Sequence, residues 1–313
     1  MERIVFLDRD AIRTPIRRPR FEHTWTEYPT SAPEQLRARL EGATIAVTNR
    51  MFLRAPHMPP TLRLIAVSAT GYECIDVDAC RARRIAVCNV REWAVSVPEH
   101  VFAMALALRR NLSGYHAAAT GGEWARSPTY CVLKEPLNRA LWGNTLGIIG
   151  YGALGRAVAS IASAFHMNVL VGERKGISPA RPGREPFADV LRTSDVVVVL
   201  CPLTPETRGL IGAAEMDLMK PDALLINCAR GGIVIEADLA AALAAGRIGG
   251  AGVDVLEVEP PPSDNPLLQL RLENLIVTPH VGWASRESLE NLAEQLIQNI
   301  EAFVRGEVRN RVA

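Results

Sequence analysis

Short, continuously apolar runs recur along the whole chain, and stretches with helical spacing separate them. The runs are rich in β-branched residues and lack polar alternation, which is typical of strands buried on both faces of a parallel sheet. They cover residues 4–7, 44–48, 62–68, 85–90, 146–150, 169–172, 196–200, 224–227, 252–255 and 275–278. Strand–helix alternation over the full length predicts an α/β fold with doubly wound parallel sheets.

The number of these runs predicts two domains. Ten strands are many for one open sheet, and 313 residues fit two domains at roughly 100–200 residues each. In the middle of the chain we expect a long apolar helix at residues 97–112. An irregular segment at 113–144, with Trp124 and Trp142, follows it. A long stretch without its own structure is usually functional or contacts another chain.

The charge balance excludes the simplest polyanionic partners. Lys and Arg number 35 against 34 Asp and Glu, whereas proteins that bind nucleic acid or anionic membranes usually carry a basic surplus. We expect no signal peptide and no membrane span, because no apolar stretch is long enough. The six cysteines form no CxxC pair, which predicts reduced thiols in a cytoplasmic protein and no metal site.

A glycine-rich turn directly follows the run at 146–150 and opens a predicted helix. Its residues are Gly150, Tyr151, Gly152, Ala153, Leu154 and Gly155. This pattern suits a dinucleotide, because the glycines permit the tight turn and close backbone approach while the helix N-terminus faces the pyrophosphate. The next strand ends at Glu173, 173 − 150 = 23 residues later, where a ribose-binding carboxylate belongs. Glu173 favours NAD, although Arg174 and Lys175 follow it and leave NADP possible.

Three ionisable residues, Arg230, Glu259 and His280, follow other strands of the same predicted sheet. Ligands of open α/β sheets bind outside the carboxyl ends of the strands, so the three are expected on the cofactor's edge. Taken singly, each has a structural interpretation: a surface ion pair for the arginine, and a packed or capping residue for the histidine. Taken together, they indicate hydride transfer to a carbonyl beside a carboxylate.

Each of the three has a role in that chemistry. The planar guanidinium of Arg230 is suited to hold a carboxylate bidentately and polarise the adjacent carbonyl. His280 donates a proton to the forming alkoxide and takes it back in the reverse direction. Glu259 beside the imidazole favours its protonated form. The remaining histidines, which we interpret as structural, are His23, His57, His100, His116 and His166.

The chain resembles the D-isomer-specific 2-hydroxyacid dehydrogenases over essentially its whole length. The strongest motifs are LGIIGYGALG at 146–155, CPLTPETRGLI at 201–211, NCARGG at 227–232, GVDVLEVEP at 252–260 and TPHVGWAS at 278–285. Within the family, ATGYECID at 69–76 and CNVREWAVSVPEHVFA at 88–103 most resemble the glycerate dehydrogenase/hydroxypyruvate reductase branch.

The resemblance implies two similar α/β domains with the active site between them. Residues 1–97 and 286–313 then form a flavodoxin-like substrate-binding domain, and 98–285 form an inserted NAD-binding Rossmann domain. A homodimer is also implied, with residues 113–144 as the arm that embraces the partner. The substrate is expected to be a small 2-keto or 2-hydroxy acid, hydroxypyruvate or glyoxylate above others.

The resemblance also implies roles for individual residues. Arg230 orients the substrate, Glu259 is the partner of the histidine, and His280 is the acid/base; Arg230 and His280 also border the cofactor. Further cofactor contacts are expected from Cys201, Pro202, Thr207, Cys228, Ala229 and Asp254, beside Glu173 and Arg174. Further substrate contacts are expected from Ala69, Thr70, Gly71 and Trp283. The chain departs from common family residues at Arg84, Ala94, Ile235 and Gly282, and these departures leave the exact substrate open.

Two other functions fit the same motifs. A cofactor-sensing, non-enzymatic corepressor keeps the same three ionisable residues, but the chain lacks the extended polar tails typical of such scaffolds. A dehydrogenase for another small acid, of D-lactate type or for formate or phosphite, is the second alternative. The Arg230 clamp and the room expected beside Trp283 favour a 2-keto acid over formate.

Overall fold

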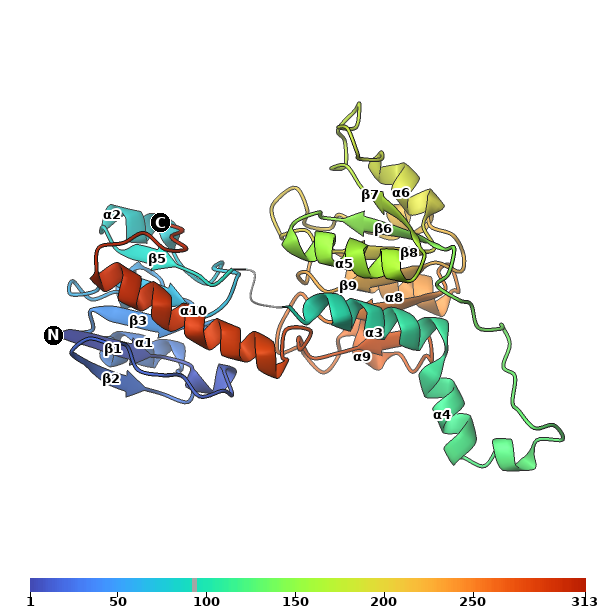
Figure 1. The fold of residues 1–313 in the computed structure, drawn as a ribbon, viewed down its shortest axis with the longest axis horizontal. Helices are drawn as coiled ribbons and strands as arrows, with labels where there is room; N and C mark the ends of the chain where they lie inside the picture. Colours follow the sequence, from blue (N-terminus) through green and yellow to red (C-terminus); the bar gives the residue numbers. More distant parts are fainter. Residues whose placement is uncertain (92–94) are drawn as a thin grey trace. The chain divides into compact units, whose positions relative to one another are not determined.

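The computed structural model describes residues 1–91 and 95–313, so Ala94 lies outside the described residues. The chain divides into two compact units. Unit 1 comprises residues 1–95 and 283–313, and unit 2 comprises residues 96–282. The chain therefore leaves unit 1, builds unit 2 completely, and returns to unit 1 for its last helix (Figure 1).

Unit 1 contains a parallel sheet in the order β2-β1-β3-β4-β5. The strands are β1 (Glu2–Phe6), β2 (His23–Glu27), β3 (Ile45–Thr48), β4 (Leu64–Val67) and β5 (Ala86–Cys88). Successive side chains point to opposite faces, so Ile4 and Phe6 pack in one apolar cluster while Val5 and Leu7 pack in another. The first cluster lies under α10 (Arg286–Val304), and the second includes Cys80 of α2 (Val77–Ala82) and Leu36 of α1 (Leu36–Arg39).

Strand β2 was not predicted from the sequence. It reads HTWTE, and its five residues are only half-buried or exposed. It pairs with β1 alone, at the edge of the sheet. An edge strand that exposes its side chains needs no apolar run, so the pattern that identified the other strands is missing here.

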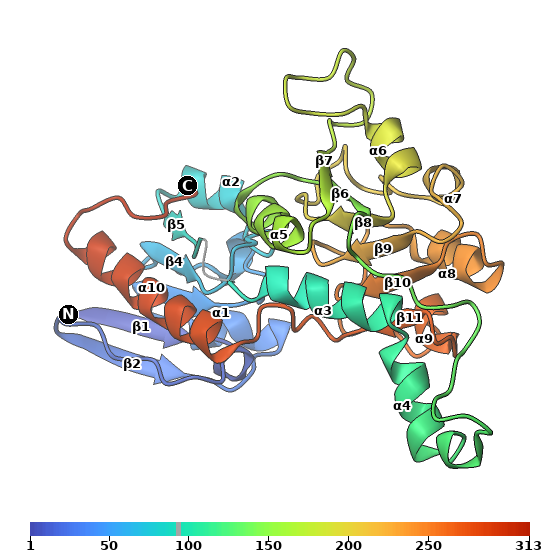
Figure 2. The same ribbon diagram turned by 45° about the vertical axis from the view of Figure 1, so that its right-hand side comes forward.

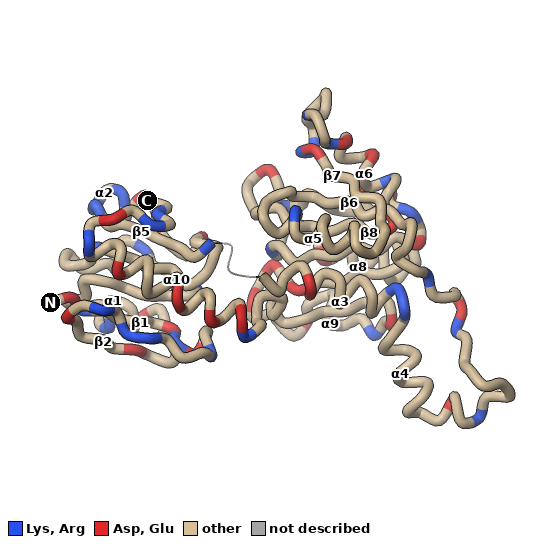
Figure 3. The backbone as a smooth tube through the Cα atoms, in the orientation of Figure 1, with Lys and Arg blue, Asp and Glu red and all other residues tan. Residues whose placement is uncertain are grey.

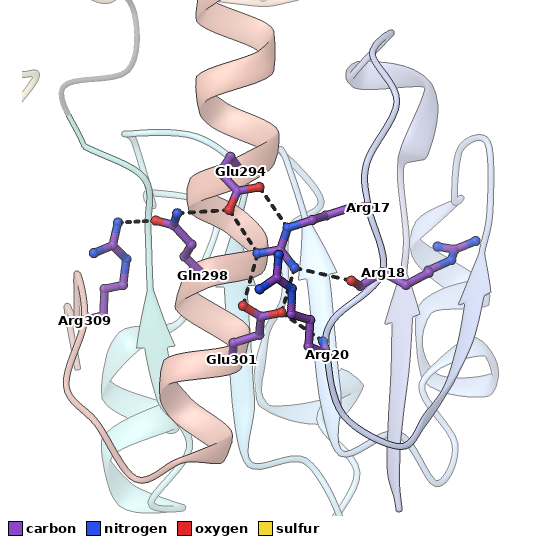
Figure 4. A network of polar contacts seen from close by, with 7 residues as sticks. All are labelled: Arg17, Arg18, Arg20, Glu294, Gln298, Glu301 and Arg309. Atoms are coloured by element: carbon purple, nitrogen blue, oxygen red, sulfur yellow. Dashed lines mark hydrogen bonds and ion pairs between the residues drawn. The ribbon is translucent and has the colours of Figure 1, made fainter.

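Helix α10 is fastened to the N-terminal part of unit 1 by a polar network (Figure 4). The Arg17 guanidinium donates to both carboxylate oxygens of Glu294 at 2.8 and 2.9 Å and reaches Glu301 at 2.6 and 3.1 Å. Glu294 and Glu301 are seven positions apart, two turns of a helix. One arginine therefore spans two turns of α10 and joins the C-terminal helix to the segment after β1.

Unit 2 contains a parallel sheet in the order β11-β10-β9-β8-β6-β7. The strands are β6 (Thr145–Ile149), β7 (Asn168–Val171), β8 (Val196–Val199), β9 (Leu224–Asn227), β10 (Gly250–Val253) and β11 (Leu275–Val277). The order reverses between β6 and β8, which makes their carboxyl ends the switch point where such sheets bind ligands. Both sheets are parallel, which confirms the predicted α/β fold class.

Helices lie on both faces of the unit 2 sheet (Figure 2). Helices α3 (Val97–Arg109) and α5 (Ala153–Ala164) pack together on one face. There Gly252 of β10 lets Met104 of α3 approach, because an added Cβ would lie 2.9 Å from its sulfur. The other face carries α6 (Phe187–Thr193), α7 (Ala213–Met216) and α8 (Glu236–Ala244), and α9 (Pro266–Gln269) contacts α8.

The helix expected at 97–112 is broken, and the segment expected to be irregular is partly helical. Helix α3 ends at Arg109, and Asn111 takes a left-handed conformation with φ +42°. Its side chain accepts from the Gly114 N–H and caps a separate helix, α4 (Leu112–Thr120). An asparagine tolerates this conformation and caps helices well. Helix α4 leads away from the body of unit 2, and the chain beyond it turns back toward the sheet (Figure 1); Trp124 and Tyr130 in this returning segment have exposed side chains.

Within the described residues, no helix is long and apolar enough to cross a membrane. The same part of the chain holds no group of three or more His, Cys, Asp or Glu side chains placed to bind a metal ion. Basic and acidic residues, 35 and 34 in number, are interspersed along both units (Figure 3). The remaining short elements are the 3₁₀ turns Arg9–Ala11, Pro33–Gln35, Ala55–His57 and Trp124–Arg126.

Candidate active site

The glycine-rich turn lies between β6 and α5, at the switch point of the unit 2 sheet. Gly150 has φ +103°, and an added Cβ would lie 2.4 Å from the backbone nitrogen of Cys201. A Cβ on Gly155 would lie 2.4 Å from the Gly150 carbonyl oxygen. These two glycines are therefore required by close backbone packing. At Gly152, an added Cβ would meet none of the described atoms within 4 Å.

This turn fits a dinucleotide pyrophosphate. Gly152 stands at the N-cap of α5 and, having no side chain, leaves the first-turn N–H groups without a side-chain cap. Such groups attract an anion, and the helix dipole adds to the attraction. The open side of Gly152 lets a phosphate approach the backbone.

Glu173 lies two residues beyond the end of β7, and its side chain is only 1% exposed. The Arg181 side chain donates to it bidentately at 2.5 and 2.6 Å, and the backbone N–H of Arg174 donates at 2.7 Å. The Arg181 hydrogen bonds, followed by the backbone contact from Arg174, lower the pKa of the Glu173 carboxyl to about 2. The carboxylate is thus ionised and held at neutral pH, and Arg181 is a contact that the sequence analysis missed.

The loop after β8 carries three residues expected at the cofactor: Cys201, Pro202 and Thr207. Cys201 packs against Gly150, and burial raises the pKa of its thiol to about 11. The Thr207 hydroxyl donates to the Pro202 carbonyl and accepts from the Thr204 N–H, both at 2.7 Å. These bonds give Thr207 a role in shaping the loop.

Arg230 lies in the turn after β9, and main-chain contacts fix that turn. The buried Asn227 side chain donates to the Arg230 carbonyl at 3.1 Å and accepts from the Ala229 N–H at 3.1 Å. Gly231 lies against the backbone of Leu256, where an added Cβ would be 2.0 Å from the carbonyl carbon and oxygen. This contact brings the Arg230 turn directly against the segment that leads to Glu259. Cys228 beside it is buried, and burial followed by the charge of Asp254 raises the pKa of its thiol.

Asp254 follows β10 and organises the end of β11. Its side chain accepts from the Thr278 hydroxyl at 2.6 Å and from the N–H groups of Val281 and Gly282, each at 2.9 Å. His100 of α3 lies 3.0 Å from the Thr278 oxygen and 3.5 Å from Asp254. Burial opposes ionisation of Asp254, but the hydrogen bonds, that of His100 foremost, outweigh it and lower its pKa.

His100 therefore belongs to the polar network beneath the site, which the sequence analysis did not indicate. A histidine at the start of a helix carries no signal of its partners, because they come from a strand end far along the chain. The same network accounts for the glycine at position 282. A Cβ there would lie 3.0 Å from Asp254 and 3.2 Å from the His100 ring, so position 282 has little room for a side chain.

Glu259 and His280 lie together. The Nδ1 atom of His280 is 2.8 Å from Oε2 of Glu259. The other oxygen, Oε1, accepts from the Leu256 N–H at 3.0 Å, which orients the carboxylate. His280 itself has φ +54°, and its backbone N–H donates to the Asp254 carbonyl at 2.8 Å. An ionised carboxylate only accepts hydrogen bonds, so in this pair Nδ1 carries the hydrogen and donates it to Glu259.

The remaining candidates belong to unit 1. Ala69, Thr70 and Gly71 follow β4, where the Asn89 side chain donates to the Thr70 carbonyl at 2.7 Å. Ser68, just before them, is fully buried. Trp283 packs against the apolar cluster of unit 1 that contains Ile4 and Phe6.

Comparisons with known proteins agree with this geometry. A family model described as "D-isomer specific 2-hydroxyacid dehydrogenase, NAD binding domain" matches residues 102–282. The glycerate dehydrogenase of Methylorubrum extorquens is 44% identical over 315 residues, covering 99% of both chains. The hydroxypyruvate reductase of Blautia hydrogenotrophica is 34% identical, over 89% of this chain and 88% of that protein. Among solved structures, the NADPH-dependent glyoxylate/hydroxypyruvate reductase of Sinorhizobium meliloti has a TM-score of 0.84 at 26% identity, covering 100% and 98% of the two chains.

Proposed function

The chain belongs to the D-isomer specific 2-hydroxyacid dehydrogenases, a family of oxidoreductases with an NAD-binding domain, and we propose that it reduces hydroxypyruvate or glyoxylate. The observation that carries the proposal is the His280–Glu259 pair, with 2.8 Å between Nδ1 and Oε2. The pair stands on the sheet edge that holds the glycine-rich turn. The relatives with 44% and 34% identity are named for glycerate and hydroxypyruvate.

His280 acts as the general acid in the direction of reduction. Its Nδ1–H is donated to Glu259, so its Nε2–H is the proton available to the carbonyl oxygen of the keto acid. Glu259 stabilises the protonated imidazole before that transfer and fixes the ring during it. In the reverse direction, Nε2 takes the hydroxyl proton back.

Arg230 binds the substrate carboxylate. Its guanidinium presents a planar set of donors that matches a carboxylate, and the contact between Gly231 and Leu256 fixes the turn that carries it. A 2-keto acid places its carbonyl next to that carboxylate, so one arginine both orients the substrate and polarises the bond to be reduced.

The cofactor is a nicotinamide dinucleotide, which supplies the hydride when it is bound. The backbone N–H groups at the start of α5 are suited to the pyrophosphate, and Glu173 stands near the strand end where a ribose-binding carboxylate belongs. We assign the surrounding loop residues Cys201, Pro202, Cys228, Ala229 and Asp254 to the walls of this site. We also assign unit 2 as the NAD-binding domain and unit 1 as the substrate-binding domain.

We further propose a cytoplasmic homodimer whose arm is residues 113–144. The exposed side chains of Trp124, Tyr130 and Leu133 support an apolar contact surface on the arm. All six cysteines are free thiols, which supports a reducing compartment. Light scattering on the purified chain and on a Trp124→Ser/Tyr130→Ser variant tests the arm. A wild type that is monomeric contradicts it.

The test of the function is a panel of 2-keto acids assayed with NADH and NADPH. We expect NADH oxidation with hydroxypyruvate or glyoxylate, weaker activity with pyruvate, and none with formate and NAD⁺. Absence of turnover across the panel, with nucleotide still bound, contradicts the proposal and favours a cofactor-sensing role.

A further inference from the structure

The Glu173 carboxylate has no acceptor position left for a ribose. Its Oε1 accepts from the Arg174 backbone N–H at 2.7 Å and from Arg181 Nη2 at 2.5 Å. Its Oε2 accepts from Arg181 Nε at 2.6 Å and from the Arg181 backbone N–H at 3.2 Å. A carboxylate offers about four lone-pair sites, and four donors occupy them. A ribose diol therefore hydrogen-bonds to Glu173 only after the Arg181 side chain has moved away.

Arg181 is placed to meet a ligand itself. A guanidinium has five N–H groups, and the contact with Glu173 uses those of Nε and Nη2, so the outer edge of the fork keeps donors for another anion. The Arg181 side chain is 56% exposed, whereas that of Glu173 is 1% exposed. The segment between β7 and α6 that carries Arg181 projects from the body of unit 2 in both ribbon views (Figures 1 and 2).

Two of the neighbouring basic side chains, Lys175 and Arg184, have other contacts. Lys175 pairs with Glu215 at 2.8 Å. Arg184 lies over the ring of Tyr151, with 5.2 Å between its guanidinium carbon and the ring centroid. Arg181 therefore differs from them, because it combines a bidentate hold on the ribose-binding carboxylate with an exposed outer edge. It also offsets the negative charge with which Glu173 would repel a 2′-phosphate.

We propose that Arg181 determines which cofactor this enzyme prefers, by masking Glu173 from a ribose diol and by donating to the 2′-phosphate of NADPH. This inference rests on the proposed cofactor site. With the Arg181–Glu173 pair closed, the site accepts NADPH. With the pair open, Glu173 accepts the ribose hydroxyls of NADH. The chain therefore uses both cofactors, although the position after β7 is the glutamate expected of an NAD enzyme.

The test is direct binding of two nucleotides that differ by one group. Isothermal titration calorimetry with adenosine 2′,5′-bisphosphate and with 5′-AMP isolates the 2′-phosphate and requires no turnover. We expect the wild type to bind the bisphosphate more tightly. In Arg181→Gln, the affinity for the bisphosphate should fall about tenfold or more, while that for 5′-AMP stays equal or rises. Arg181→Lys keeps the positive charge but loses the forked guanidinium. The ratio of its affinities for the bisphosphate and 5′-AMP should therefore lie between the ratios of the wild type and Arg181→Gln.

Arg192→Gln is the matched control, because Arg192 pairs with Asp189 at 2.9 Å on the exposed side of α6. The ratio of the two nucleotide affinities in Arg192→Gln should equal that of the wild type. An unchanged ratio in Arg181→Gln, with circular dichroism showing a folded chain, overturns the inference. So does equal weakening of both nucleotides. A shifted ratio in a protein that reduces no keto acid contradicts the proposed function and leaves this inference standing.

Discussion

Replacing Glu259 with glutamine tests how the carboxylate serves His280. The wild-type carboxylate accepts at both ends, from the Leu256 N–H at 3.0 Å and from His280 Nδ1 at 2.8 Å. A glutamine has one oxygen and one NH₂ group. If the glutamine oxygen keeps the contact with the Leu256 N–H, the NH₂ group faces Nδ1 of His280, and two donors oppose each other. If the amide turns the other way, the NH₂ group faces the Leu256 N–H, and two donors oppose each other there. One of the two contacts is lost in either orientation.

The magnitude follows from the contact that is lost. A hydrogen bond to a charged group contributes about 1.5–3 kcal/mol, and about 1.4 kcal/mol corresponds to a factor of ten. Glu259→Gln should therefore lower kcat for keto-acid reduction by about tenfold to a hundredfold near neutral pH.

The assay is the measurement of kcat and KM for hydroxypyruvate with saturating NADH at neutral pH. Glu257→Gln is the matched control, since Glu257 has a 58% exposed side chain that pairs with Arg208 at 3.1 Å. The control should retain the wild-type kcat and KM. An unchanged kcat in Glu259→Gln would refute the reasoning, because it means that losing one of the two contacts of the carboxylate does not affect proton transfer.

Three further outcomes follow from the geometry. His280→Asn should lose about 10²–10⁴-fold in kcat while keeping nucleotide binding in calorimetry, because asparagine tolerates the left-handed φ of +54° found there; retained turnover removes His280 as the proton donor. Gly231→Ala should lower the free energy of unfolding by about 3 kcal/mol, because its Cβ would lie 2.0 Å from the Leu256 backbone; a wild-type Tm contradicts this. Glu173 has a folded pKa of about 2 against an ordinary value of 4.5, chiefly because of Arg181. Its contribution to stability is therefore complete above pH 4.5 and is lost as pH falls toward 2. The urea midpoint of the wild type should exceed that of Glu173→Gln at pH 5 and approach it at pH 3, and a gap that stays constant counts against the ion pair.

The fold class was predictable because buried parallel strands leave continuous apolar runs in the sequence. Strand β2 left no such run, since it stands at a sheet edge with its side chains half-buried or exposed. The break at Asn111 was also missed. A single left-handed residue between two apolar stretches does not disturb their spacing, although the asparagine three residues before Gly114 is a capping signal in retrospect.

The candidate site was predictable where a residue follows a strand, because parallel strands carry their ends to one edge. The residues that contact this site from loops and helices were not predictable in the same way. Arg181 reaches Glu173 from a loop without periodicity, and His100 reaches Thr278 from a helix 178 positions earlier in the chain. Polar contacts between separate elements depend on packing, which local sequence patterns do not encode.

The contact between Gly231 and Leu256 has a consequence for how such an enzyme changes over time. It joins two loops through main-chain atoms, and every amino acid supplies the same main chain. Substitutions in the side chains around these loops can therefore alter which acid is preferred without separating the turn that carries Arg230 from the segment that leads to Glu259. Only the glycine itself is a vulnerable point, since any side chain at position 231 would force the loops apart. New substrate ranges can thus arise while the geometry of proton transfer is inherited intact.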